Sequence, residues 1–337
     1  MKRLLALLVL LTAGAAPAPT RIALPRGFRP TAVAVAGSNI IVAGLSGQVV
    51  VVHDGRLSAA IAAGANPSSI DAALGLIAVA NHETDYVTLI SGSTPRTLHL
   101  HSRPHPHAVA IGDFDGDGKP DLAVDSWGEN RIMLLFGRDG WRGPGTPLDI
   151  GTRPYFTIAA ADVDGDGNVD LVTPNWGAGT VSVLLGDGHG HFAHAPGSPF
   201  RAGPSPFAAA VGDVNGDHRP DILVANYSGH ATDTANDGLT WIRNDGARRF
   251  TAFPQRVAAG DYSARVAVGD VNGDGINDAV FPNGNGSTVT VVYGSRAGLR
   301  GTTTIPVMRH PHAVAVLGGR VVVAGEEEDA LLIVAGH

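Results

Sequence analysis

Four short segments concentrate carboxylate and amide side chains at a fixed spacing. Each follows the pattern Asp-x-Asp/Asn-x-Asp-x-x-x-Asp, and they begin at Asp113, Asp162, Asp213 and Asp270, at intervals of 49, 51 and 57 residues. Positions 1, 3, 5 and 9 offer hard oxygen donors, and position 7 can add its backbone carbonyl. Flexible cages of such oxygens select Ca²⁺, because Mg²⁺ demands a tighter octahedron and keeps its waters. The sequence therefore predicts up to four calcium sites.

The predicted ligands occupy positions 1, 3, 5, 7 and 9 of each segment. They are Asp113, Asp115, Asp117, Lys119 and Asp121; Asp162, Asp164, Asp166, Asn168 and Asp170; Asp213, Asn215, Asp217, Arg219 and Asp221; and Asp270, Asn272, Asp274, Ile276 and Asp278. Lys119, Asn168, Arg219 and Ile276 would each offer a carbonyl oxygen. The alternative is four solvated acidic hairpins, but so many carboxylates within nine residues repel one another without a cation.

The third segment is expected to bind calcium most weakly. Asn215 replaces one carboxylate, as Asn272 does in the fourth segment, and His218 stands where the other three segments have a turn glycine. Affinity for Ca²⁺ rises with ligand charge and site rigidity. A non-glycine residue at positive φ adds strain. The Asp213 site should therefore empty first.

Short apolar stretches flank each segment and repeat with it, for example residues 107–111, 121–124 and 132–136 around the first. Glycine and proline make up 67 of the 337 residues, charged residues only 16% and hydrophobic residues 44%. This composition excludes a disordered chain and a helical bundle. Units of about 50 residues with four short antiparallel strands each predict an all-β fold, the β-propeller, in which stacked blades complete one another's core.

Three further units have tight glycine turns, at Gly37, Gly75 and Gly318, in place of the aspartate segments. Seven blades follow, and we place them at residues 29–64, 65–102, 103–151, 152–203, 204–260, 261–309 and 310–337. The last unit stops after its third strand, so residues 21–25 are expected to supply the missing outer strand. Such closure hides the sheet edges. Residues 20–337 would then be a single domain; the alternative is an open array or two domains.

The first 18 residues are predicted to be a secretory signal peptide. Lys2 and Arg3 precede an apolar run at residues 4–11 and small residues at 13–18. The run is too short to span a bilayer, which needs about 20 residues, and no later stretch approaches that length. We therefore expect a secreted or periplasmic protein without a membrane span.

Charge and cysteine content exclude further classes. The chain has no cysteine, so it has no disulfide or thiolate nucleophile. Its formal charge of −7 would become +1 with four bound Ca²⁺ ions, and −1 once Lys2 and Arg3 are removed. No basic patch supports nucleic-acid binding. The expected mature protein is a near-neutral monomer.

The repeated aspartate segment followed by an apolar strand resembles the FG-GAP/VCBS repeat family, which includes the propeller of integrin α-subunits. The stretch from Leu185-Gly186-Asp187-Gly188 to Phe192 is similar to that family's turn after the third strand. The resemblance covers residues 103–309 well and the flanking units in outline. It implies a calcium-stabilised propeller, but it implies no single activity, because one fold hosts many functions.

The face opposite the aspartate segments collects aromatic, amide and carboxylate side chains from the turns before the first strands and from the loops after the second strands. The candidate ligand-binding residues are His107, Asp125, Trp127, Tyr155, Asn175, Trp176, Phe207, Asn226, Tyr227 and His312. Flat apolar rings beside hydrogen-bonding groups suit a glycan or a protein segment. The alternative is that Trp127 and Trp176 fill gaps between blades and that the asparagines only form turns.

These observations predict a secreted calcium-binding propeller that acts as a non-enzymatic binding module for a glycan or protein. The alternative is a hydrolase or lyase at the mouth of the central channel, where His107 and His312 would bind a metal or act as base and acid with Asp125 or Glu326. No nucleophile elbow, phosphate loop or His-Glu-x-x-His motif is present, and no catalytic residue is assigned. The fifth unit is longer than its neighbours within residues 228–238, and long loops on rigid scaffolds often carry function.

Overall fold

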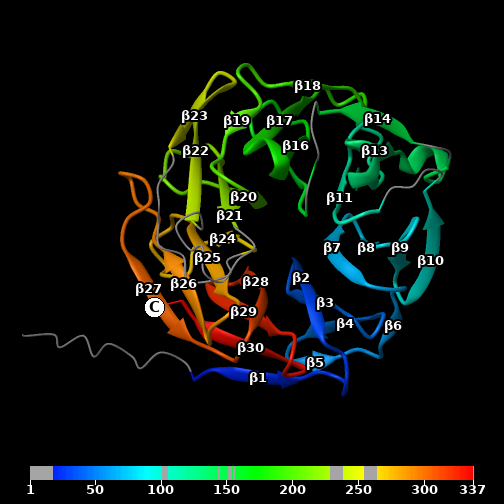
Figure 1. Cartoon of the computed structure of the whole chain (residues 1–337), viewed down its shortest axis with the longest axis vertical. Helices are drawn as coiled ribbons and strands as arrows, with labels where there is room; N and C mark the ends of the chain where they lie inside the picture. Colours follow the sequence, from blue (N-terminus) through cyan, green and yellow to red (C-terminus); the bar gives the residue numbers. More distant parts are fainter. Residues whose placement is uncertain are drawn as a thin grey trace, which may run out of the picture.

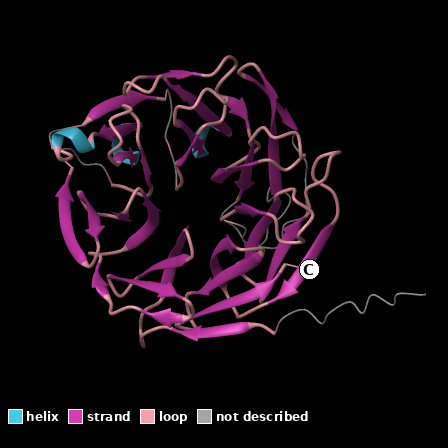
Figure 2. Ribbon diagram, turned by 180° about the vertical axis from the view of Figure 1, so that it is seen from behind, coloured by secondary structure: helices cyan, strands magenta, loops and turns pink. Residues whose placement is uncertain are grey.

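Seven antiparallel sheets surround a central channel in the computed structural model of the chain (Figure 1). The structure describes residues 18–336 apart from 101–104, 143–144, 151–153, 155, 228–237 and 254–263. Figure 2 shows the same ring from behind, with strands making up nearly all of its regular structure. The predicted seven-bladed propeller is confirmed.

Each sheet is one blade, and its strands run outward from the channel in chain order, except that β1 is the outermost strand of blade 7. Blade 1 holds β2 (Pro30–Ala36), β3 (Asn39–Gly44), β4 (Gln48–His53), β5 (Arg56–Leu57) and β6 (Ile61–Ala62). Blade 2 holds β7 (Pro67–Ala73), β8 (Leu76–Asn81), β9 (Tyr86–Ser91) and β10 (Thr94–His99). Blade 3 holds β11 (Val109–Gly112), β12 (Asp121–Ser126), β13 (Arg131–Leu135) and β14 (Thr146–Asp149), with 3₁₀ turns η1 (Trp127–Glu129) and η2 (Gly137–Asp139).

The remaining blades repeat this order. Blade 4 holds β15 (Ala159–Ala161), β16 (Asp170–Asn175), the 3₁₀ turn η3 (Trp176–Ala178), β17 (Thr180–Gly186), β18 (Phe192–His194) and β19 (Phe200–Arg201). Blade 5 holds β20 (Pro206–Gly212), β21 (Asp221–Asn226), β22 (Gly238–Gly246) and β23 (Arg249–Phe253). Blade 6 holds β24 (Ala267–Gly269), β25 (Asp278–Asn283), β26 (Thr288–Val292) and β27 (Thr302–Pro306). Blade 7 holds β28 (Pro311–Leu317), β29 (Arg320–Gly325), β30 (Ala330–Ala335) and, from the other end of the chain, β1 (Thr20–Ala23).

Strand β1 closes the ring, as predicted. It pairs antiparallel with β30, and Ile22 lies opposite Leu331. Beyond the strand, the backbone N–H of Leu24 donates to the carbonyl of Asp329 at 2.8 Å. The Asp329 carboxylate accepts hydrogen bonds from the N–H groups of Gly27 (2.6 Å) and Arg29 (2.8 Å). The two ends of the chain are thus joined by both backbone and side-chain hydrogen bonds.

The core is a ring of seven apolar clusters, each shared between two neighbouring blades. The cluster between blades 7 and 1 includes Ile22 and Leu24 from the closing segment, packed with Val42 and Val322. Because each blade buries both faces against neighbours, no blade has a core of its own. Opening the ring would expose two such faces.

Two sequence predictions concern residues that the structure does not describe. The predicted signal peptide lies outside the described residues except for Ala18, and residues 228–237 of the long fifth-blade loop also lie outside them. Among the described residues, no helix is long and apolar enough to cross a bilayer.

Candidate functional site

The four aspartate segments connect the first and second strands of blades 3 to 6 and therefore share one face of the ring. Backbone hydrogen bonds fasten them to adjacent blades. The N–H of Gly190 in blade 4 donates to the Phe114 carbonyl in the first loop at 2.8 Å, and the N–H of Asn277 in blade 6 donates to the Asp213 carbonyl at 3.0 Å. The neighbouring blades thus hold these loops in place.

The first loop wraps its backbone around its acidic groups. One oxygen of Asp113 accepts the N–H of Gly118 at 2.9 Å, and carboxylate oxygens of Asp113, Asp115 and Asp121 lie within 4.8 Å of one another. The second loop gathers the same three positions, namely Asp162, Asp164 and Asp170. These sets of carboxylate oxygens suit Ca²⁺ by their chemistry and spacing.

Two of these carboxylates are buried and face an arginine. The Asp115 side chain is fully buried with Arg138 Nη1 at 2.5 Å from Oδ2, and that of Asp164 is 1% exposed with Arg248 Nε at 2.7 Å. A buried carboxylate is stable only beside compensating positive charge. Both loops thus require cationic charge at the third position, which a bound divalent ion would also supply.

The ninth-position aspartates are buried at the start of each second strand. The two oxygens of Asp170 accept the N–H groups of Val163 (2.7 Å) and Gly186 (2.8 Å), which ties the loop to its blade. Burial nevertheless raises the pKa of Asp170 to about 6 and that of Asp221 to about 7. A cation in the loop favours the ionised carboxylate, so these positions fit a calcium ligand set.

His218 occupies the left-handed region, with φ of 65°. The corresponding residues of the other loops are Gly118, Gly167 and Gly275, with φ of 79°, 90° and 84°. Its N–H donates to Asp213 Oδ2 at 2.8 Å, the same contact that Gly118 makes with Asp113. The third loop therefore adopts the shape of the others with a residue that is less suited to it.

A continuous run of rings crosses the opposite face. The ring centroids of His107 and Phe156 are 5.9 Å apart, those of Phe156 and Phe207 4.3 Å, and those of Phe207 and Tyr227 5.3 Å. The Arg265 guanidinium lies 4.4 Å from the Phe156 centroid. We call His107, Phe156, Phe207 and Tyr227 the aromatic arc; it spans blades 3 to 5.

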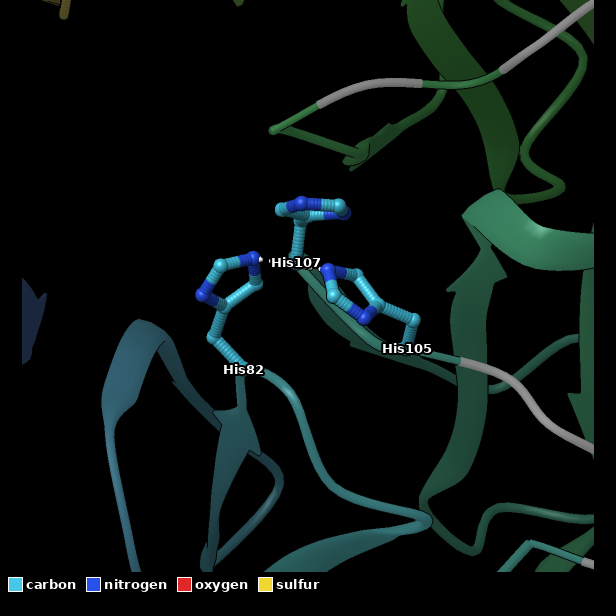
Figure 3. A group of neighbouring side chains, drawn as sticks. All are labelled: His82, His105 and His107. Atoms are coloured by element: carbon cyan, nitrogen blue, oxygen red, sulfur yellow. Dashed lines mark hydrogen bonds between the residues drawn. The ribbon is translucent and has the colours of Figure 1, made fainter.

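Three imidazoles meet at one end of the aromatic arc (Figure 3). His82 follows β8, whereas His105 and His107 lie in the segment that leads into β11. The Nε2 atoms of His82 and His105 are 2.9 Å apart, and a ring nitrogen of each of the three residues lies within 4.8 Å of the others. Burial, helped by the neighbouring imidazoles, lowers the pKa of His82 to about 4, and burial also lowers the pKa of His105. The imidazoles of His82 and His105 are therefore neutral at physiological pH.

Asp125 lies behind this histidine cluster. Its side chain is fully buried, and Oδ1 accepts the backbone N–H groups of His107 and Ala108, both at 2.7 Å. Its Oδ2 lies 3.5 Å from His107 Nδ1 and accepts no hydrogen bond among the described residues. Asp125 therefore orients the backbone and faces the ring of His107.

His312 lies apart from this cluster. Its Nδ1 lies 3.0 Å from the Thr31 carbonyl of blade 1, and burial together with the Arg265 charge lowers its pKa. The structure thus brings His107 together with His82 and His105, and it places His312 against the backbone of the next blade.

The remaining candidate residues occupy different environments. Asn175 and Asn226 are buried, and their amides donate to Ser182 Oγ (2.9 Å) and Thr240 Oγ1 (3.1 Å), which braces the loops after β16 and β21. Trp176 is 42% exposed. The side chain of Trp127 and all of Tyr155 lie outside the described residues.

The channel ends beneath the aromatic arc. A cavity of about 370 Å³ is lined by residues in or directly before the first strands of all seven blades, and its lining includes Asp71 and Arg265. Arg265 Nη2 from blade 6 donates to the Ser68 carbonyl of blade 2 at 2.9 Å, so its side chain crosses the mouth. Asp71 accepts the Ile111 N–H at 2.7 Å, and burial raises its pKa.

His82, His105 and Phe156 lie in the turns and loops that the sequence places on this face, but they were not among the candidate ligand-binding residues. One signal for His105 was present, because a residue followed by proline precedes the first strand in several blades. In the described blades this residue has positive φ: Arg29, Asn66, His105, Ser205 and His310. Aligning these pairs places His105 in the same register as His310. Which loop of the preceding blade faces them is not visible in the sequence.

Comparison with known proteins supports the family resemblance of the repeats. The FG-GAP-like repeat model matches residues 162–224, and the FG-GAP repeat model matches residues 105–128. Among solved structures, selenomethionine-substituted virginiamycin B lyase from Staphylococcus aureus is 13% identical, with a TM-score of 0.67 over 94% of this chain and 99% of that one. BBS1N in complex with ARL6DN is 11% identical, with a TM-score of 0.65 over 96% of each chain. At these identities the likeness shows the fold alone. No curated protein matches the sequence.

Proposed function

The chain belongs to the FG-GAP repeat proteins and folds as a closed seven-bladed propeller, and from this premise we propose that it is a calcium-stabilised binding module whose aromatic arc holds a glycan or protein ligand. The observation that carries the proposal is the unbroken series of ring contacts from His107 to Tyr227 across adjacent blades. Rings that present flat apolar surface beside polar groups are typical of glycan and peptide sites. BBS1N, a propeller of similar fold, is bound to a protein partner.

Binding can be tested on the chain itself with a glycan array, followed by titration of the best ligand. Phe156→Ala and Tyr227→Ala should each weaken binding about tenfold, the value of one lost ring contact and its buried area. Leu74→Ala is the matched control, because Leu74 is a 55% exposed apolar residue on the hairpin between β7 and β8, at the aspartate-loop face. Equal binding by all three variants would remove the arc from consideration. If no glycan on the array binds, and a defined protein binds through the aromatic arc, the ligand is a protein.

Calcium is proposed to stabilise the folded ring from the other face. Ions that bind only the folded state raise its stability by mass action. With dissociation constants of about 10⁻⁴ to 10⁻³ M, typical of extracellular modules, 10 mM Ca²⁺ would add about 1.4 to 2.7 kcal/mol per site. The melting temperature should therefore fall on adding EDTA and recover with Ca²⁺. A melting temperature indifferent to EDTA would contradict calcium binding.

Export is part of the proposal and rests on the order of charged, apolar and small residues in the first 18 positions. Amino-terminal sequencing of the mature protein from periplasm or medium tests it. Recovery of the intact amino terminus in the cytoplasm would refute export.

A second candidate function is that of a lyase or hydrolase at the channel mouth. The specific observation in its favour is that three imidazoles and the buried Asp125 carboxylate converge beside the cavity. A virginiamycin B lyase of similar fold was solved as a catalytically inactive histidine-to-alanine variant with quinupristin. Turnover of a ligand found on the array, abolished by His107→Gln, would favour the enzyme; binding without turnover would favour the module.

A further inference from the structure

The histidine cluster has the geometry of a metal site of a kind different from the aspartate loops. Two imidazole nitrogens bonded to one ion at about 2.0–2.1 Å lie about 2.9–3.4 Å apart when the angle at the metal is between 90° and tetrahedral. The Nε2 atoms of His82 and His105 are 2.9 Å apart, within this range, and His107 brings a ring nitrogen within 4.8 Å of both. Three ligands thus surround one point.

The environment of His107 provides a second, independent observation. Metal-bound histidines usually donate their other ring N–H to a carboxylate, a backbone carbonyl or water, which fixes the tautomer and raises the basicity of the ligand. Asp125 Oδ2, on a fully buried side chain, lies 3.5 Å from His107 Nδ1 and accepts no hydrogen bond from the described residues. The buried carboxylate therefore lies directly behind the cluster, in the position from which a carboxylate can orient a metal-bound histidine.

We propose that His82, His105 and His107 bind one divalent transition-metal ion of the Zn²⁺ type at the mouth of the channel. Imidazole nitrogens select Zn²⁺, Co²⁺, Ni²⁺ and Cu²⁺ over Ca²⁺ and Mg²⁺, which prefer oxygen. Three protein ligands leave a coordination position open for water or for an oxygen of a bound molecule. The site therefore differs from the calcium loops in ligand chemistry and in the face of the ring on which it lies.

The seventh blade offers a matched comparison. His310 and His312 have the same register as His105 and His107, but Gly284 follows β25 where His82 follows β8. His310 Nδ1 accordingly lies 2.9 Å from the Gly284 carbonyl rather than beside a third imidazole. The pair in blade 7 should not bind the ion.

The test is metal titration of the whole purified chain without a polyhistidine tag, in excess Ca²⁺ so that the aspartate loops are saturated. Co²⁺ reports its coordination through its visible absorption bands, and Zn²⁺ is measured by competition with a chromophoric chelator. The expected result is one equivalent of Co²⁺ displaced by Zn²⁺. His82→Ala and His105→Ala should weaken binding at least 100-fold, and His310→Ala should leave it unchanged.

Asp125→Asn keeps an oxygen for the two backbone N–H groups but removes the charge, so it should weaken Zn²⁺ binding about 10- to 100-fold. Melting curves of each variant separate loss of metal from loss of fold. Absence of a tight equivalent in a folded wild-type chain, or equal binding by His82→Ala, would overturn the site. The titration needs no glycan or protein ligand, so its result is independent of the proposed binding function.

Discussion

His218 gives the sharpest test of how the aspartate loops work, because the third and fourth loops share their first five residues, Asp-Val-Asn-Gly-Asp, and then diverge. The sixth residue is His218 in one loop and Gly275 in the other, with φ of 65° and 84°. A Cβ built on Gly275 meets no atom within 4 Å, so a side chain can begin there without a clash, and the exchange acts mainly through backbone strain. The reciprocal variants are His218→Gly and Gly275→His.

The expected magnitude follows from the backbone. A non-glycine residue in the left-handed region lowers the free energy of unfolding by roughly 1–2 kcal/mol through backbone strain. Glycine avoids this strain, but the greater conformational entropy of its unfolded chain lowers the free energy of unfolding by about 0.5–1 kcal/mol. His218→Gly should therefore raise the free energy of unfolding by about 0.5–1 kcal/mol, and Gly275→His should lower it by a similar amount. For a chain of this size the melting temperature would move by about 1–3 °C in each direction.

Denaturant unfolding in saturating Ca²⁺ and in EDTA measures both variants. The calcium titration should show the Asp213 loop emptying first in the wild type, and His218→Gly should raise its affinity by up to about fivefold, the equivalent of 1 kcal/mol. Shifts of the same sign in the two variants would refute the strain argument. A third loop that keeps its ion longest would refute the ranking of the sites.

Three further predictions concern closure, pH and the histidine cluster. Asp329→Ala should lose about 1–2 kcal/mol, because two backbone N–H groups lose their acceptor, and should expose the amino-terminal segment to limited proteolysis; Asp329→Asn should lose less. Burial lowers the pKa of His312 below its ordinary 6.5, so the unfolded chain binds more protons, and stability should fall as the pH drops from 6.5 toward the folded pKa. The change in unfolding free energy from pH 7.5 to 5.0 should be more favourable to the folded state in His312→Gln than in the wild type, because the variant lacks the His312 contribution; an equal change would contradict this. Gly284→His should create a second metal equivalent with His310 and His312. It should be about 10- to 100-fold weaker than the first, because the Glu327 carboxylate, 3.8 Å from His310 Nε2, is exposed whereas Asp125 is buried; Co²⁺ titration to one equivalent would contradict this.

The fold was predictable because each repeat contains a recognisable loop or turn between its first two strands. The aspartate segments separate the first and second strands at β11 and β12 and at the three equivalent positions, and the glycine turns do the same in the other blades. Closure of the ring was predictable from the number of strands, because blade 7 lacked an outer strand and an unassigned apolar segment preceded blade 1. Ile22 and Leu24 fill that place. Local patterns were sufficient because propeller blades contact mainly their neighbours.

The ligand face was less predictable, because its residues act across blades. The sequence suggests that the Asn175 amide binds a ligand, yet this amide donates a hydrogen bond to Ser182 Oγ within the same blade. Phe156 was placed on this face by its turn but was not chosen as a ligand-binding residue, and nevertheless its ring joins His107 to Phe207. Register within a repeat says which residues share a face, but the reach of a side chain into the next blade depends on the packing of two strands and a loop.

The histidine cluster shows why this limit matters. Comparing repeats pairs His107 with His312, since each directly follows a histidine-proline pair. In a ring, however, each such turn faces the loop that follows the second strand of the preceding blade. That loop supplies His82 to blade 3 and Gly284 to blade 7, so the same two residues form part of a three-imidazole cluster in one place and bond to backbone carbonyls in the other. The chemistry of this face is therefore set at the junctions between blades, and candidate sites in such a ring are best sought by reading each turn together with the loop one blade before it.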